Sequence, residues 1–253
     1  MLLIPAIDLR DGRCVRLVQG SFSHATSYDR DPVEMARGFA SQGARWLHVV
    51  DLDAAEGKGK NNRSVIQRIR GAVSCGIEVG GGVRSEEDAR ELLALGIDVV
   101  VLGTVLVKAP DAVAGWINRL GKRFVGGIDA RDGRVKVSGW TADGGASDLD
   151  IATGPCAAGL RGLIYTSIGR DGTLTGPDIE RTNSVAAAAR IPTILSGGIG
   201  SESDVAEVIE RADPFVVGII LGKALYESRV DFSRLVSRFP QHPEPRWESR
   251  AGS

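Results

Sequence analysis

Eight short apolar runs alternate along the chain with stretches of helical character, and each run predicts a β-strand. The runs are rich in β-branched residues, are continuous rather than alternating with polar residues, and are bounded by Gly or Asp. Runs of this kind are typical of parallel strands that are buried on both faces. The predicted strands are Leu2–Ile7, Trp46–Val50, Ile77–Val79, Val99–Leu102, Phe124–Ile128, Gly162–Tyr165, Thr193–Leu195 and Phe215–Leu221.

The segments between these runs are amphipathic and carry helix start signals, namely a capping Asp or Ser or a proline at the first helical position. Eight βα units in a row favour a closed barrel over an open sheet. The predicted fold class is therefore α/β, a single (β/α)₈ TIM barrel. The start signals are Asp31-Pro32, Ser85-Glu86-Glu87-Asp88, Pro110-Asp111 and Ser201-Glu202-Ser203-Asp204.

Two sequence patterns occur twice at nearly the same spacing. The segment from Ile7 to Arg13, IDLRDGR, returns 121 residues later as IDARDGR, and the segment from Gly81 to Asp88, GGVRSEED, returns 116 residues later as GGIGSESD. Each copy follows a predicted strand. We infer that the barrel consists of two similar half-barrels related by a two-fold internal repeat.

Length and composition agree with one compact unit. The 253 residues match the roughly 250 that are typical of this barrel, although two small domains would also fit the length. We expect residues 1–238 to form the catalytic barrel and residues 239–253 to be a polar, disordered tail. The net charge of −1 gives no support to a nucleic-acid or anionic-membrane partner.

The cysteines and histidines are scattered and show no metal-ligand spacing, so we expect neither a metal nor a cofactor. Isolated thiols fit a reducing compartment, the first residues turn charged too early for a signal peptide, and no apolar run is long enough for a membrane span. We therefore expect a cytoplasmic protein, and a monomer. The residues concerned are Cys14, Cys75 and Cys156, and His24, His48 and His242.

Chemistry in such a barrel takes place at the carboxyl ends of the strands. Asp8 and Asp129 follow the first and fifth strands, and the repeat places them on opposite sides of the mouth. A lone Asp in such a place usually caps a loop, but a facing pair favours acid–base catalysis. After the sixth strand Thr166 adds a hydroxyl, and Asp171, in an Asp-Gly sequence that could equally be a plain turn, adds a third carboxylate.

Glycine pairs follow the third and seventh strands, and a Gly with a polar neighbour follows the fourth and eighth. Glycine lets backbone N–H groups approach an anion, and a helix N-terminus favours negative charge. One such pair could be a simple turn, but two related pairs predict two phosphate sites on opposite sides of the mouth. The small-molecule substrate should carry a phosphate at each end. The residues are Gly81, Gly82, Gly103 and Thr104 on one side and Gly197, Gly198, Gly222 and Lys223 on the other.

Residues 1–238 resemble the phosphoribosyl-formimino-aminoimidazole-carboxamide ribotide isomerases of histidine synthesis. The motifs that carry the resemblance are Ile4-Pro5-Ala6-Ile7-Asp8, Val15-Arg16-Leu17-Val18-Gln19-Gly20, His48-Val49-Val50-Asp51-Leu52-Asp53, Gly80-Gly81-Gly82-Val83-Arg84, Ser138-Gly139-Trp140, Arg170-Asp171-Gly172-Thr173-Leu174, Ser196-Gly197-Gly198-Ile199 and Gly222-Lys223-Ala224-Leu225.

The resemblance implies an aldose–ketose isomerase, an intramolecular oxidoreductase that carries out an Amadori rearrangement on the bisphosphorylated aminoimidazole carboxamide ribotide (ProFAR). An acid protonates the ring oxygen of the aminoaldose, and a base removes the C2 proton. By the same resemblance Asp8 is the base and Asp171 the acid, with Asp129 and Thr166 in support, although the acid role could fall to Asp129. It also implies a substrate- and phosphate-binding set that includes Arg16, Arg84, Trp140 and Gly176.

Three other functions stay open at this point. A bifunctional enzyme would also isomerise phosphoribosylanthranilate for tryptophan synthesis, but Ser138 stands where those enzymes carry an arginine. An imidazole-glycerol-phosphate cyclase subunit shares the sequence Thr166-Ser167-Ile168 but has lysine in place of Arg16. The last alternative is a phosphate-binding barrel without activity, which the intact aspartates argue against.

Overall fold

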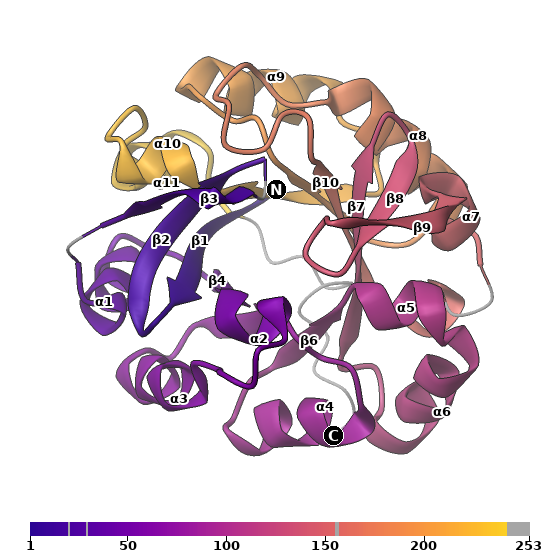
Figure 1. The fold of residues 1–253 in the computed structure, drawn as a ribbon. Helices are drawn as coiled ribbons and strands as arrows, with labels where there is room; N and C mark the ends of the chain where they lie inside the picture. Colours follow the sequence, from indigo (N-terminus) through magenta and orange to yellow (C-terminus); the bar gives the residue numbers. More distant parts are fainter. Residues whose placement is uncertain (20, 29, 155–156, 242–253) are drawn as a thin grey trace.

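Eight parallel strands close into a barrel in the computed structural model, which describes residues 1–19, 21–28, 30–154 and 157–241 (Figure 1). Hydrogen bonding runs from strand to strand around the ring, and pairing between β7 and β10 closes it. All eight predicted strands are confirmed. They are β1 (Leu2–Arg10), β4 (Trp46–Asp51), β5 (Gly76–Gly80), β6 (Val99–Leu102), β7 (Phe124–Arg131), β10 (Gly162–Ser167), β11 (Thr193–Ser196) and β12 (Val216–Leu221).

The strands have two buried faces, and this explains their continuous apolar composition. Along β1, Leu2, Ile4 and Ala6 belong to the cluster inside the barrel, whereas Leu3 and Ile7 pack outward against the helices. Side chains alternate between the two faces of a strand. Asp8 therefore continues the inward series at the carboxyl end of the strand.

Helices surround the barrel, and the four predicted start signals are confirmed. Asp31, Ser85 and Ser201 cap α1, α4 and α9, and Pro110 is the first residue of α6. The described helices are α1 (Pro32–Ser41), α2 (Leu52–Glu56), α3 (Arg63–Ala72), α4 (Glu86–Ala94), α5 (Thr104–Lys108), α6 (Pro110–Leu120), α7 (Asp148–Ala152), α8 (Ile179–Ala189), α9 (Glu202–Arg211), α10 (Lys223–Tyr226) and α11 (Phe232–Arg238), with a short 3₁₀ turn at Ala157–Gly159.

Two antiparallel extensions, which the apolar pattern does not predict, rise from β1 and β7 on opposite sides of the opening (Figure 1). In the first, β1 turns back into β2 (Arg13–Val18) and β3 (Ser21–Ser27). In the second, β7 turns back into β8 (Arg134–Val137) and β9 (Ala142–Ser147). Both turns consist of an Asp-Gly pair with positive φ at each residue, the geometry of a type I′ hairpin. The repeated IDxRDGR segment is therefore a strand, a turn and the start of a second strand.

The second repeated segment also has the same structure in both halves. Ser85 and Asp88 form a capping box at the start of α4, and Ser201 and Asp204 form the corresponding box at the start of α9. The predicted (β/α)₈ barrel with two similar halves is confirmed. Among the described residues, no helix is both long and apolar enough to cross a membrane.

The structure follows the chain to Gln241, three residues into the predicted tail. The side-chain oxygen of Gln241 accepts a hydrogen bond from the Leu3 N–H at 3.1 Å, and its amide donates to the Gly43 carbonyl at 3.0 Å. The rest of that tail, including His242, lies outside the described residues, as does Cys156. The division at residue 238 stays a prediction.

Candidate active site

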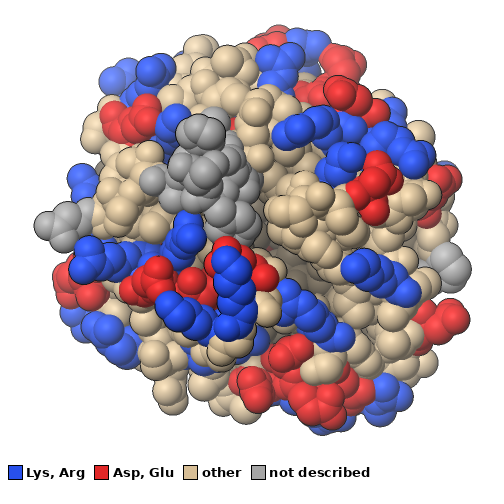
Figure 2. Space-filling view, in the orientation of Figure 1, with Lys and Arg blue, Asp and Glu red and all other residues tan. Residues whose placement is uncertain are grey.

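A cavity of about 260 Å³ opens at the carboxyl ends of the strands, and its wall includes residues from all eight of them. Figure 2 shows the face that carries the two hairpins, with a hollow near its centre and Lys and Arg side chains at several places around the rim. Of the sixteen predicted site residues, fifteen line this cavity. Gly176 is the exception: it does not line the wall, and its N–H donates to the carbonyl of Gly198 at 3.0 Å.

Asp8 is held by an arginine from the neighbouring hairpin strand. The Arg16 Nη1 donates to Asp8 Oδ2 at 2.8 Å, and Nη2 donates to the carbonyl of Ala6. The guanidinium also lies over the Tyr226 ring, 4.6 Å from its centroid, and Arg16 is only 7% exposed. Arg16 therefore lines the site as predicted, and its charge is directed at the Asp8 carboxylate.

Asp129 occupies the matching place on β7 but has neutral partners. The Trp140 indole and the Thr166 hydroxyl are the polar groups that act on its carboxylate. Burial raises the pKa of Asp129 above its usual value, and these two neighbours oppose that rise. Asp129, Trp140 and Thr166 all line the cavity.

Asp171 lies on the loop after β10 and is electrostatically coupled to both of the other carboxylates. Burial, and then the charge of Asp8, raise the pKa of Asp171 to about 7, although Arg16 opposes the rise. The loop is held by two backbone hydrogen bonds, from Asp171 N–H to the Ser167 carbonyl and from Gln19 N–H to the Asp171 carbonyl. A carboxyl group with this pKa can donate a proton near neutral pH.

The glycine turns after β5 and β11 require glycine for steric reasons. Gly82 and Gly198 both have positive φ, and a Cβ at either position would overlap neighbouring backbone: that of Ala54 at Gly82 and that of Gly176 at Gly198. Close backbone packing therefore excludes a side chain at Gly82 and at Gly198.

Several polar residues of the predicted phosphate sites already hold neighbouring loops. Arg84 donates to the carbonyls of Ala54 and Ala55 at 3.0 and 2.9 Å. The Thr104 hydroxyl accepts a hydrogen bond from Ser138 N–H at 2.9 Å, and Lys223 Nζ donates to the Gly172 carbonyl at 2.9 Å. These side chains support the shape of the rim around the cavity.

The capping boxes at α4 and α9 reduce the number of backbone N–H groups that are free to contact a phosphate. The Asp88 carboxylate accepts hydrogen bonds from the N–H groups of Arg84 and Ser85, and Asp204 does the same for Gly200 and Ser201. Three N–H groups at the start of each helix are thus already engaged, those of Arg84, Ser85 and Asp88 at α4 and those of Gly200, Ser201 and Asp204 at α9. The glycine turns and the starts of α5 and α10 at Gly103 and Gly222 are the better candidates for contact with an anion.

His48 belongs to the site, although its isolated place in the sequence gave it no role. It lines the cavity, and its Nδ1 lies 2.7 Å from Glu78 Oε1. A signal was present in the sequence: His48 stands at the inward-facing position between Trp46 and Val50 of a strand that is otherwise apolar. Among the described residues, no three His, Cys, Asp or Glu side chains are placed to hold a metal ion.

Residues 2–231 match the model of the family described as Histidine biosynthesis protein. The chain belongs to this family. The match spans every strand of the barrel, so the site described above is that of a histidine biosynthesis protein.

Curated relatives carry one and the same name, 1-(5-phosphoribosyl)-5-((5-phosphoribosylamino)methylideneamino) imidazole-4-carboxamide isomerase. The protein of Moorella thermoacetica is 46% identical, over 89% of this chain and 93% of its own. That of Thermodesulfovibrio yellowstonii is 44% identical, over 91% and 94%. That of Parasynechococcus marenigrum is 43% identical, over 93% and 92%.

Proposed function

We propose that this protein is an aldose–ketose isomerase that converts ProFAR by an Amadori rearrangement. The observation that carries the proposal is the convergence of Asp8, Asp129 and Asp171 on one cavity that is flanked by two glycine turns. Relatives that are 43–46% identical over most of their length are named as isomerases of this compound.

The roles of the carboxylates follow from their surroundings. Asp171, with a pKa of about 7, gives a proton to the ring oxygen, and the bond from that oxygen to C1 breaks. The Asp8 carboxylate removes the proton from C2, and the electrons of that bond form the enolamine. Asp8 then returns a proton to C1 while Asp171 takes the proton of the C2 hydroxyl, which leaves the ketose and restores both groups.

Asp129 supports the reacting ribose, together with Thr166 and Trp140, which orient its carboxylate. The two phosphates bind at opposite sides of the mouth, one at Gly81, Gly82, Gly103 and Thr104 with Arg84 behind them, and the other at Gly197, Gly198, Gly222 and Lys223, where Gly176 supports the turn. A structure with a bisphosphate analogue tests this assignment. A ligand whose phosphates meet neither glycine turn would refute it.

We also propose that the protein is a monomer and is located in the cytoplasm. A monomer is consistent with the absence of exposed large hydrophobic side chains among the described residues, and the free thiols of Cys14 and Cys75 suit a cytoplasmic enzyme. Sedimentation at two concentrations tests the first part.

The purified protein, assayed alone on ProFAR, tests the activity. We expect the aminoketose to form without an added partner protein, cofactor or ammonia, with Asp8→Asn as the negative control. If ProFAR stays unchanged, or if turnover is seen only on the ketose product in the presence of ammonia, the assignment is wrong.

A further inference from the structure

A histidine–glutamate pair lies at the floor of the cavity, and none of the roles above uses it. His48 on β4 and Glu78 on β5 are partners in register on adjacent strands, and both side chains point into the barrel. The Glu78 side chain is fully buried, whereas the His48 side chain is 12% exposed and lines the cavity. The histidine is therefore the member of the pair that a bound molecule can reach.

The surroundings of the pair are apolar, which makes its presence informative. In the same layer of the barrel, β1 contributes Ala6 beside His48, and β6 contributes Val99 beside Glu78. Glu78 Oε2 is buried and has no hydrogen-bond partner among the described residues. An apolar residue would fill this place without a half-satisfied carboxylate, so packing alone does not account for Glu78.

The position of His48 relates it to the reacting centre. Ala6, its neighbour in register, lies two residues before Asp8 on the inward face of β1. His48 thus lies one layer below Asp8 in the barrel and lines the same cavity.

We propose that His48 contacts the substrate and that Glu78 is its positioning residue. The Glu78 carboxylate accepts the Nδ1–H of His48 and so leaves Nε2 as an unprotonated acceptor toward the cavity. There Nε2 accepts a hydrogen bond from a hydroxyl of the reacting ribose. The identity of the donor, a ribose hydroxyl, rests on the proposed function. The tautomer of the His48 ring does not.

The tautomer can be measured without any substrate. The chain has three histidines, so ¹⁵N spectra of histidine-labelled protein at pH 8, compared with those of His48→Gln, identify the two ring nitrogens of His48. We expect a protonated Nδ1 and an unprotonated Nε2. A protonated Nε2 in the wild-type protein would overturn the proposal, whether or not the protein acts on ProFAR.

Kinetics on ProFAR test the contact. Glu78→Leu should lower kcat/KM about 10- to 100-fold, the loss expected for one buried hydrogen bond to a reacting group. Glu78→Gln, whose amide oxygen still accepts the Nδ1–H, should stay at least tenfold above Glu78→Leu. Because Glu78 acts only through His48, the double variant His48→Gln/Glu78→Leu should be no slower than His48→Gln.

Additive losses in the double variant would assign Glu78 a structural role and refute the proposal. If Glu78→Leu does not fold, the isosteric Glu78→Gln and the ¹⁵N spectrum of His48 still test the positioning role of Glu78. Equal kcat/KM in the wild type and in His48→Gln would refute the proposed contact. A wild-type protein that is inactive on ProFAR but shows the expected tautomer would overturn the substrate and leave the positioning role supported.

Discussion

The two half-barrels have the same backbone at their hairpins but different side chains around the catalytic carboxylate. Asp8 and Asp129 lie 121 residues apart in the chain. Each lies near the carboxyl end of a strand that leads into an Asp-Gly turn. Arg16 pairs with Asp8, but the residue 121 positions after Arg16 is Val137. The polar neighbours of Asp129 are Trp140 and Thr166 instead. The repeated backbone thus places two carboxylates in equivalent positions, one beside an arginine and the other beside neutral polar groups.

The polar clusters that hold the two turns differ as well. In the first half the buried Asn62 accepts a hydrogen bond from Gly12 N–H, and its amide donates to Asp51 and Asp53. In the second half the buried Asp148 donates its N–H to the Gly133 carbonyl.

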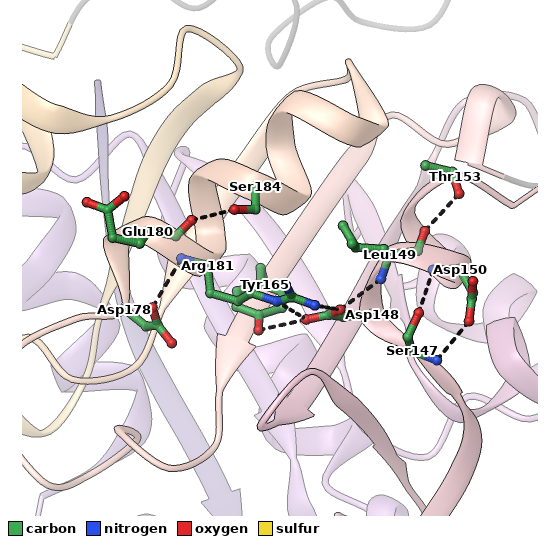
Figure 3. Close-up of polar contacts among 10 residues, drawn as sticks. All are labelled: Ser147, Asp148, Leu149, Asp150, Thr153, Tyr165, Asp178, Glu180, Arg181 and Ser184. Carbon is green, nitrogen blue, oxygen red and sulfur yellow. Dashed lines mark hydrogen bonds and ion pairs between the residues drawn. The ribbon is translucent and has the colours of Figure 1, made fainter.

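Asp148 also binds the guanidinium of Arg181 through both of its oxygens and accepts the Tyr165 hydroxyl at 3.0 Å (Figure 3). One turn is held by a neutral amide that lies between two carboxylates, and the other by the backbone N–H of an aspartate whose side chain forms an ion pair. Different polar residues can therefore maintain the same backbone geometry.

The largest expected effect separates the two carboxylates. Asp8→Asn keeps the shape of the side chain but removes the base, so we expect kcat to fall by about 10²–10⁴-fold in a protein that still folds. Asp11→Asn, at the exposed tip of the same hairpin, is the matched control and should keep full activity. If Asp8→Asn stays within tenfold of the wild type while Asp129→Asn does not, the base belongs to the second half.

The next effect concerns the polar clusters that hold the two hairpin turns. Arg181→Met leaves the fully buried Asp148 without its cation and should lower the free energy of unfolding by about 3 kcal/mol. Asn62→Leu removes hydrogen bonds rather than a charge and should cost about 1–3 kcal/mol. Arg211→Met, which removes an exposed arginine that bridges Glu180 and Glu207, should cost less than about 1 kcal/mol. Urea unfolding of the three variants ranks them, and a larger loss for Arg211→Met would contradict the comparison.

A pH profile tests the role of Asp171. The raised pKa means that its protonated form is present below about pH 7 and is lost as the pH rises through that value. We therefore expect kcat/KM to fall about tenfold per pH unit above about 7, since kcat/KM reports the free enzyme. In Asp171→Asn this limb should disappear along with most of the activity. A limb that persists in Asp171→Asn and vanishes in Asp129→Asn would transfer the acid role to Asp129.

The smallest expected effect concerns a second substrate. Phosphoribosylanthranilate has a carboxylate that a guanidinium clamps best, and Ser138 on the second hairpin is neutral and short. Arg16 is buried against Asp8 and so is already engaged. Without one charge-assisted hydrogen bond, worth about 1.5–3 kcal/mol, activity on phosphoribosylanthranilate should be about ten- to a hundredfold below that on ProFAR. Complementation of strains that lack each isomerase, with kinetics on both substrates, measures it; comparable efficiencies would make the enzyme bifunctional.

Local sequence patterns were sufficient to predict most of the frame. The eight barrel strands and the caps at Ser85 and Ser201 depend on residues close in sequence, and the inward position of Asp8 follows from the alternation of side chains along β1. The hairpin strands were missed because Arg13–Val18 and Arg134–Val137 mix charged and apolar residues, which is typical of an exposed strand.

The sequence predicted which residues line the site but not which side chains contact one another. Asp148 and Arg181 are 33 residues apart, and nothing in either segment predicts that they meet. The pairing of Arg16 with Asp8 depends on the register of a hairpin that was not predicted. His48 was missed because its partner Glu78 lies on another strand, and a lone histidine within an apolar run usually has a packing role.

The hydrogen bond between Gln241 and Leu3 brings together two residues that are 238 positions apart in the chain. In a closed ring of strands no strand is first by geometry, and here the place where the chain enters the ring adjoins the place where it leaves. Gly121 and Lys122 are exposed between α6 and β7, at the boundary of the halves. A circular permutant that joins Gln241 to Met1 through a short linker and opens at Lys122 would retain every strand pairing while exchanging the order of the halves.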